Sequence, residues 1–293
     1  MELLNINSSE LDKMEELGRG ACSVVYKYDD NSVVKVLNEA GKELFDSEKF
    51  SNIVGIENDT CVFPEKAVLI DGELKGYTMD YIQGEMLHEI IKKIDLSTLT
   101  NAIKKVENDL KQLSKEKILL QDLNHGGIMW DNKESRIKII DTDFFYKENL
   151  AQEEQCYSSN ITSFNTLIEM ELGILNGQDT EVIRYLQNKP EYNTLYKEYM
   201  IGSLIGENKS VTELIDKAIE IVEKDFGTKV NNIEEMQQLI EKQKKTEKED
   251  TNALEDELEL KDEQLSNLEK EAELISELET LRDIQIGKKE EQK

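Results

Sequence analysis

The sequence predicts an α+β protein with two lobes, a small β-rich N-terminal lobe and a mostly helical C-terminal lobe, followed by a long C-terminal helix that forms a coiled coil. Short apolar segments separated by glycine turns fill residues 1–82. Helical spacing of apolar residues dominates residues 83–229, and an acidic segment without proline covers residues 230–293. These three ranges are the predicted N-terminal lobe with its connecting strand, the C-terminal lobe and the helical tail.

A glycine turn opens the first predicted hairpin. Gly18 and Gly20 are separated by one residue, and an apolar strand at residues 23–26 follows them. The next strand, residues 33–37, carries Lys35 among apolar residues. Glycines let a hairpin tip bring its backbone amides close to a phosphate, and a strand lysine supplies the cation. A glycine pair alone indicates only a turn, but with this lysine it indicates a nucleotide-binding site.

Acidic residues end two apolar segments in the middle of the chain. Asp122 follows residues 118–120, and Asp141 and Asp143 follow the strand predicted at 137–140. Each acid by itself is typical of a turn after a strand. Phosphoryl transfer needs one carboxylate that orients the attacking hydroxyl and another that holds Mg²⁺ on the phosphates. Because the acids follow a glycine turn and a strand lysine, we interpret them as that pair.

The order of these parts resembles the protein kinase-like superfamily, in particular divergent bacterial-type serine/threonine protein kinases and pseudokinases, over about residues 11–227. The resemblance implies two catalytic residues: Asp122, which orients the acceptor, and Lys35, which grips the phosphates of ATP. It also implies that Asp141 binds Mg²⁺. The nucleotide site would include Gly18, Gly20, Ser23 and Val25, with Ser23 in the place of the family's third glycine.

The resemblance also implies an acidic partner for Lys35 on a helix. Residues 41–54 predict a helix that carries Glu43 and Glu48. We choose Glu48, because its distance along the chain from Lys35 suits the family's third helix better, and Glu43 remains open.

The strand that ends at residue 82 is similar to the segment that connects the two kinase lobes. The similarity implies that Met79 flanks the adenine of ATP. It further implies that the backbone of residues 80–82, including Asp80 and Tyr81, provides the hydrogen-bonding edge for the base.

Several positions depart from the protein-kinase pattern. Gly127 stands where the family carries the asparagine that holds a second metal ion, and Thr142 replaces the phenylalanine of the metal-binding motif. Asp143 lies two residues from Asp141 on an extended segment, so we expect it to supply the missing ligand. Asp143→Ala is then expected to lower turnover by orders of magnitude, and Gly127→Asn to be neutral or mildly activating.

Three functions fit this pattern. The first is an ATP-dependent phosphotransferase that uses Mg²⁺ and modifies serine or threonine hydroxyls of a protein. The second is a pseudokinase scaffold that presents a C-terminal coiled coil. The third is a small-molecule kinase of the aminoglycoside or choline type, favoured by the short segment after Asp143, which lacks the family's Ala-Pro-Glu ending.

The second lobe is predicted to be helical. Leu99, Ile103, Val106, Leu110 and Leu113 form one apolar stripe that ends before the Asp122 loop. Further helices are predicted after Asn160, interpreted as an N-cap, and over residues 181–187, 193–204 and 211–226. Ser210 and Gly227 are suited to begin and end the last of these.

The tail has the composition of a long helix. Residues 230–293 contain twenty Asp and Glu against ten Lys and Arg, no proline, and no glycine before Gly287. Apolar residues recur at steps of four and three, which predicts self-association or partner docking through residues 254–281. The seam residues are Leu254, Leu258, Leu265, Leu268, Ala272 and Ile275, interrupted by Lys261, with a later phase at Leu274, Leu278 and Leu281. We expect residues 241–252 to be a solvated linker, and a charged single helix is the alternative for the whole tail.

Composition limits the partners. The formal net charge of −27 argues against nucleic acid or an anionic membrane as the main partner. Three cysteines without paired spacing indicate a reducing compartment and no structural zinc or disulfide framework. Neither a membrane span nor a signal peptide is evident, so a cytoplasmic location is expected.

Overall fold

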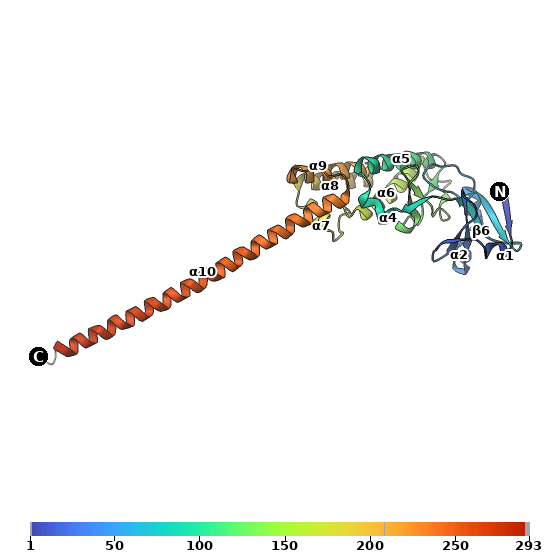
Figure 1. Ribbon diagram of the computed structural model, residues 1–293. Coiled ribbons are helices and arrows are strands. Elements are labelled where there is room, and N and C mark those ends of the chain that lie inside the picture. Colours follow the sequence, from blue (N-terminus) through green and yellow to red (C-terminus); the bar gives the residue numbers. More distant parts are fainter. Residues whose placement is uncertain (1, 208, 291–293) are drawn as a thin grey trace. The chain divides into compact units, whose positions relative to one another are not determined.

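The computed structural model describes residues 2–207 and 209–290; within the last helix, the side chains of residues 253, 256 and 271–290 lie outside that description. The protein is an α+β molecule, with a mixed six-stranded sheet in its N-terminal part and helices in its C-terminal part (Figure 1). The chain forms two compact units, Met1–Gln238 and Leu239–Lys293.

The six-stranded sheet has the order β1-β5-β6-β4-β3-β2. Its strands are β1 (Glu2–Ile6), β2 (Glu16–Arg19), β3 (Ser23–Lys27), β4 (Ser32–Leu37), β5 (Lys66–Ile70) and β6 (Glu73–Asp80). Neighbouring strands are antiparallel except β1, which runs parallel to β5. The strand β1 and the short helix α1 (Ser8–Leu11) that follows it were not predicted from the sequence.

Alternation along β4 separates the two faces of the sheet. Val33 and Leu37 belong to one buried cluster with Phe50 and Tyr77, whereas Val34 belongs to a second cluster with Ile6. Because side chains alternate along a strand, Lys35 lies on the same face as Val33 and Leu37.

Two short helices, α2 (Glu39–Leu44) and α3 (Ser47–Ile53), replace the single helix predicted over residues 41–54. The backbone of Phe45 is extended, and the Asp46 side chain accepts hydrogen bonds from the amides of Glu48 and Lys49. The prediction was wrong because Asp46 is an N-cap residue that starts a new helix in the middle of the range.

The helical part carries two small sheets and seven α-helices within the described residues. One sheet has the order β10-β9-β7 and the other pairs β11 with β8. The strands are β7 (Gly84–Met86), β8 (Ile118–Leu119), β9 (Ile128–Asp131), β10 (Arg136–Ile139) and β11 (Tyr146–Lys147). The helices are α4 (Leu87–Ile90), α5 (Leu96–Lys115), α6 (Glu153–Leu172), α7 (Glu181–Gln187), α8 (Pro190–Ile205), α9 (Val211–Phe226) and α10 (Ile233–Glu290), with 3₁₀ turns at Ile91–Lys93 and His125–Gly127.

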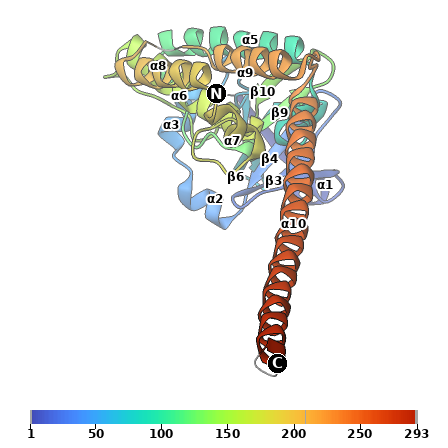
Figure 2. The ribbon, with the colours of Figure 1, turned by 90° about the vertical axis from the view of Figure 1, so that its left-hand side faces the viewer.

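Helix α5 packs against elements from the middle of the chain. Its predicted apolar stripe is buried, and the helix packs against α6 and lies beside α9 (Figure 2). Ser210 caps α9 and Gly227 ends it in the left-handed conformation, as predicted.

The prediction for the beginning of α6 was wrong. This helix begins at Glu153, with Gln152 as its N-cap, and Asn160 lies inside the helix with no exposed surface. An N-cap residue cannot be told from a buried polar residue by its type alone, because both roles satisfy an Asn side chain with backbone partners.

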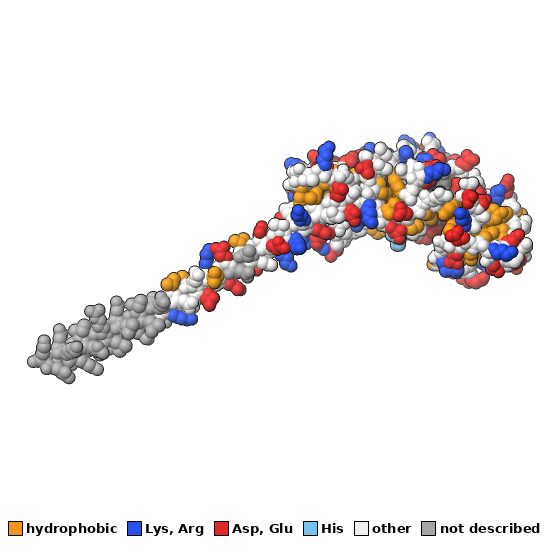
Figure 3. Space-filling model, viewed as in Figure 1, with side chains coloured by type: hydrophobic (Ala, Val, Ile, Leu, Met, Phe, Trp, Pro, Cys, Tyr) orange, Lys and Arg blue, Asp and Glu red, His pale blue; other side chains and the backbone are white. Residues whose placement is uncertain are grey.

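The tail is helical from Ile233 to Glu290, including the range 241–252 that was expected to be a linker. The first compact unit ends at Gln238, beyond the predicted boundary at residue 230, and Ile233 and Met236 are buried. Charged side chains of both signs and exposed leucines alternate along the described part of α10 (Figure 3). The predicted seam residues beyond 270 have side chains outside the description.

Candidate functional site

Lys35 on β4 is the centre of the site. Only 8% of the residue is exposed, and its Nζ lies 2.5 Å from Oδ1 of Asp141 and 2.9 Å from Oδ1 of Asp143. These partners come from the segment after β10, more than a hundred residues along the chain. The structure therefore brings together three of the residues singled out in the sequence.

The ionisation of this cluster follows from its burial and its charges. Burial opposes the ammonium form of Lys35, but the Tyr77 oxygen and the Asp143 and Asp141 carboxylates outweigh burial and raise the pKa of Lys35. Burial also raises the pKa of Asp141. Burial acts in the same direction on Asp143, but Lys35 and a hydrogen bond from Asp141 prevail and lower the pKa of Asp143.

The backbone between the two acids is fixed from the N-terminal part of the chain. Thr142 is buried, and its hydroxyl donates a hydrogen bond of 2.8 Å to the carbonyl of Val62. The Val62 amide in turn donates to the Ile139 carbonyl, and the Ile139 amide to the Thr60 carbonyl, both at 2.8 Å. The threonine that replaces the expected phenylalanine thus ties Asp141 and Asp143 to residues 60–62.

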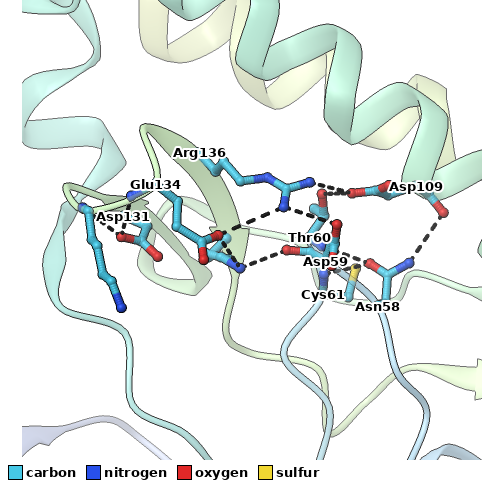
Figure 4. A network of polar contacts seen from close by, with 10 residues as sticks. Asn58, Asp59, Thr60, Cys61, Asp109, Asp131, Glu134 and Arg136 are labelled. Atoms are coloured by element: carbon cyan, nitrogen blue, oxygen red, sulfur yellow. Dashed lines mark hydrogen bonds and ion pairs between the residues drawn. The ribbon is translucent and has the colours of Figure 1, made fainter. Parts of the chain in front are cut away.

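A polar network holds residues 58–61 in place (Figure 4). The Thr60 hydroxyl donates to Asp109 of α5 at 2.7 Å. Arg136 at the start of β10 lies 3.0 Å from Asp59 and 3.6 Å from Asp109. Asn58 accepts hydrogen bonds from the amides of residues 60 and 61. The segment that fixes the backbone between Asp141 and Asp143 is therefore anchored on both α5 and β10.

Asp122 lies exposed in the loop between β8 and the 3₁₀ turn. Its φ of 59° is left-handed, a conformation that Asp tolerates better than most residues. The Asn124 side chain donates to the Asp122 carbonyl at 2.8 Å and accepts from the Gly126 amide at 2.9 Å. Asn124 thus shapes the backbone of the loop.

Asn160 supports the other end of this loop, and sequence reasoning missed that role. Its Oδ1 accepts a hydrogen bond from the Leu120 amide at 2.9 Å, and its Nδ2 donates to the Ile118 carbonyl at 2.8 Å. A polar residue on the apolar side of a helical pattern was the available signal, because such a side chain needs partners when buried. Asn160 is a positioning residue for the Asp122 loop.

Gly127 brings the Asp122 loop against Asp141. A Cβ atom on Gly127 would lie 2.9 Å from the Cβ of Asp141, and the Gly127 carbonyl accepts from the Ile140 amide at 2.8 Å. The two acid-bearing segments are therefore in direct contact at this glycine.

The glycine loop connects β2 and β3. The Gly20 amide donates to the Ser23 carbonyl at 2.9 Å, and Val25 pairs with Lys35 across the β3–β4 ladder. A Cβ atom on Gly18 would meet nothing within 4 Å, and one on Gly20 would lie 3.9 Å from the Ser23 carbonyl oxygen. Contacts in the described structure therefore do not require glycine at either position.

The connecting segment follows β6. Met79 is buried and Asp80 is exposed. The Tyr81 amide donates to the Asn31 carbonyl at 2.7 Å, so this one donor of the predicted adenine edge has an internal partner. Lys27 lies 5.5 Å from the centre of the Tyr81 ring.

The structure does not bring the predicted acidic partner to Lys35. Glu48 is exposed in the first turn of α3, and Glu43 is exposed in α2. In the described chain, the ion pairs of Lys35 join it to Asp141 and Asp143. The expected pairing is corrected accordingly: the break at Asp46 puts Glu48 at a helix start, where it is exposed.

The cluster fits Mg²⁺ in one respect. Mg²⁺ in phosphoryl-transfer sites takes one or two carboxylates together with phosphate oxygens and waters, and Asp141 and Asp143 are two such carboxylates. Among the described residues, no group of three or more His, Cys, Asp or Glu side chains is arranged to hold a metal ion. No helix in that part of the chain is long and apolar enough to cross a membrane.

Comparisons with known proteins add no further constraint. No protein-family model matches the chain, and a search of curated proteins found no match.

Proposed function

We propose that this protein is an ATP-dependent phosphotransferase with a protein kinase-like fold that transfers the γ-phosphate of ATP to a serine or threonine hydroxyl of a protein. The observation that carries the proposal is the cluster of Lys35, Asp141 and Asp143. One buried cation beside two carboxylates matches the charges that a Mg²⁺-phosphate group needs.

The contact between Gly127 and Asp141 supports the proposal that Asp122, Asp141 and Asp143 belong to one site. Asp122 lies five residues before Gly127, on a loop fixed by Asn160 and Asn124. In the proposed reaction the Asp122 carboxylate orients the acceptor hydroxyl and accepts its proton. Lys35 exchanges its carboxylate contacts for phosphate oxygens. Asp141 and Asp143 would hold Mg²⁺, which would supply positive charge to neutralise the phosphates.

The glycine loop supports phosphate binding by a separate argument. Gly18 and Gly20 have open space where side chains would lie. Packing within the chain therefore does not explain why these two residues are glycines. A ligand that approaches the backbone closely supplies such a reason. Ser23 and Val25 continue this surface along β3, beside Lys35.

The helical tail completes the proposal. We propose that its leucine seam, residues 254–281, mediates self-association or docks a partner, and that the protein works in the cytoplasm with ATP and Mg²⁺ as cofactors, without binding nucleic acid or membranes. Leu254, Leu258, Leu265 and Leu268 are each more than half exposed. Exposed leucines at heptad spacing favour pairing with another apolar surface.

Transfer of label tests the function directly. Purified protein is incubated with Mg²⁺ and γ-labelled ATP, alone and with cell extract, beside Asp122→Asn. Asp30→Asn is the matched control, because the Asp30 side chain is 94% exposed in a hairpin turn. We expect labelled protein with the wild type and the control, and at least a hundredfold less with Asp122→Asn.

Two other outcomes identify the alternative functions. A rise in melting temperature with Mg-ATP but no transfer would indicate the pseudokinase scaffold. Label that appears only in small molecules would indicate a kinase of the aminoglycoside or choline type. The pairing of β11 with β8 favours this alternative, because it leaves only a short segment after Asp143 that is not paired in a strand. Lys35→Met should remove most of the rise in melting temperature that Mg-ATP causes. A wild-type protein whose melting temperature does not rise with Mg-ATP would contradict the proposed function.

A further inference from the structure

Lys35 has a third neighbour that the proposed reaction does not use. Tyr77 lies directly opposite Lys35 in the antiparallel β4–β6 ladder, so the two side chains share one face of the sheet. The Lys35 Nζ lies 5.8 Å from the centre of the Tyr77 ring. Tyr77 is 1% exposed, so its hydroxyl is shielded from solvent.

The ammonium group has a donor for each of its neighbours. An ammonium carries three N–H donors in a roughly tetrahedral arrangement. Two of them are directed to Asp141 and Asp143. The third is available for the Tyr77 hydroxyl, since a side-chain hydrogen bond with Lys35 is among the influences on the pKa of Tyr77.

Tyr77 differs from a carboxylate partner in its charge. Burial raises the pKa of Tyr77 well above its usual value, and the opposing effect of Lys35 does not reverse this. The phenol is therefore neutral near pH 7. A neutral acceptor orients the ammonium without adding a third negative charge that would compete with phosphate for it.

The helix α3 contacts this tyrosine. The Phe50 ring of α3 lies 5.4 Å from the Tyr77 ring, centre to centre, and the Phe45 ring lies 5.0 Å from Phe50. The exposed Glu48 is on the same helix. Aromatic packing therefore takes the place that an ion pair would have between α3 and β4.

We propose that Tyr77 is the positioning residue of Lys35, and that it holds the ammonium toward the acids through its hydroxyl while Phe50 of α3 holds its ring. The inference rests on the proposed function for its catalytic meaning. The bond between the two side chains is a separate claim that needs no activity.

The first measurement is nucleotide affinity. Tyr77→Phe keeps the ring and its packing on Phe50 and removes only the hydroxyl. Since a hydrogen bond to a charged group contributes about 1.5 kcal/mol or more, we expect the KM for ATP to rise about tenfold with a smaller change in kcat. Glu48→Gln is the matched control and should leave both constants unchanged.

The second measurement is the reactivity of Lys35. Loss of the partner that holds the Lys35 amine in place should make this amine more accessible, so acetylation of Lys35 by acetic anhydride at pH 9 should become several-fold faster in Tyr77→Phe, measured by peptide mass spectrometry against the exposed Lys93. A purely structural role would not change this ratio when the melting temperature is preserved.

The outcomes separate the two proposals. Unchanged KM and unchanged acetylation in a folded Tyr77→Phe protein would overturn the positioning role, as would a loss in Glu48→Gln as large as that in Tyr77→Phe. A wild type that fails to bind Mg-ATP would contradict the proposed function, and faster acetylation of Lys35 in Tyr77→Phe would still support the bond.

Discussion

Asp141 occupies the space that a side chain on Gly127 would need, because a Cβ atom at that position would lie 2.9 Å from the Asp141 Cβ. The contact joins the loop that carries Asp122 to the end of β10. Residue 127 therefore has to be glycine for a steric reason. This reason does not depend on the metal-binding asparagine that protein kinases carry at the corresponding position.

Gly127→Asn is consequently expected to be harmful, which corrects the expectation of a neutral or activating change. Overpacking of this kind costs about 1 to 3 kcal/mol, because neither Cβ atom can move without its backbone. Urea unfolding of Gly127→Ala and Gly127→Asn measures the loss. Wild-type stability in both variants would show that the two segments separate freely.

Substitution in the glycine loop should affect ligand binding without affecting the fold. Gly18→Ala adds a Cβ atom in open space, so stability should be unchanged or should rise by up to about 1 kcal/mol. The thermal shift with Mg-ATP should shrink, because the added methyl group would stand in the proposed phosphate site.

Gly76→Ala, in β6, is the comparison for Gly18→Ala, because it adds the same methyl group at a glycine that has no space for it. Its Cβ atom would lie 2.1 Å from the Lys35 carbonyl oxygen, so it should destabilise the protein by about 3 kcal/mol. A full Mg-ATP shift in Gly18→Ala would show that the loop does not contact the phosphates.

Removal of the buried amide on α6 should destabilise the Asp122 loop. Asn160→Ala leaves the buried Leu120 amide without its acceptor and removes the bond to the Ile118 carbonyl, a loss of about 2 to 4 kcal/mol. Asn165→Ala, on the same helix, removes a bond of 3.2 Å to the Lys209 carbonyl and should cost about 1 kcal/mol. Denaturant unfolding compares the two, and equal losses would argue against a special role for Asn160.

A buried carboxyl in α6 should make stability depend on pH. Glu169 is 2% exposed; burial raises its pKa above 4.5, although hydrogen bonds from the Tyr199 and Tyr196 hydroxyls oppose the shift. The folded state then holds a proton that the unfolded state releases as pH rises above about 4.5, so this group lowers the stability with rising pH until its folded pKa is passed.

Glu169→Gln removes that titration. Relative to the wild type, the variant should gain stability as pH rises from 4.5, by at most about 1.4 kcal/mol for each pH unit. Urea unfolding at several pH values measures the difference. Parallel curves for the two proteins would mean that Glu169 titrates alike in the folded and unfolded states.

Deletion of the tail should be made beyond its buried beginning. Removal of residues 230–293 would take away Ile233 and Met236, which are buried, whereas removal of residues 246–293 keeps them. We expect the full chain to form a concentration-dependent dimer that strengthens with added salt, because salt screens the excess of acidic residues. The shorter protein should be a folded monomer. Light scattering distinguishes these states, and a full-length monomer at every salt concentration would instead favour docking to a different partner.

The sequence determined the elements that depend on neighbouring residues. Strands β3, β4 and β6, the stripe of α5 and the caps of α9 follow from periods, turns and cap residues that act within a few positions of the chain. The sequence also indicated which residue types form the site, namely a strand lysine followed by Asp141 and Asp143. Local rules sufficed because each of these features involves residues that are close in the sequence.

Only the tertiary structure decided which of these residues meet. It paired Lys35 with acids 106 and 108 positions away, placed Tyr77 opposite it, and turned Asn160 from a presumed cap into a support for the Asp122 loop. The physical reason is that a buried polar group is satisfied by whichever partner packing brings within hydrogen-bond distance. Residue type and spacing state that a partner is needed, and the packing of β4, β10 and α6 determines which residue it is.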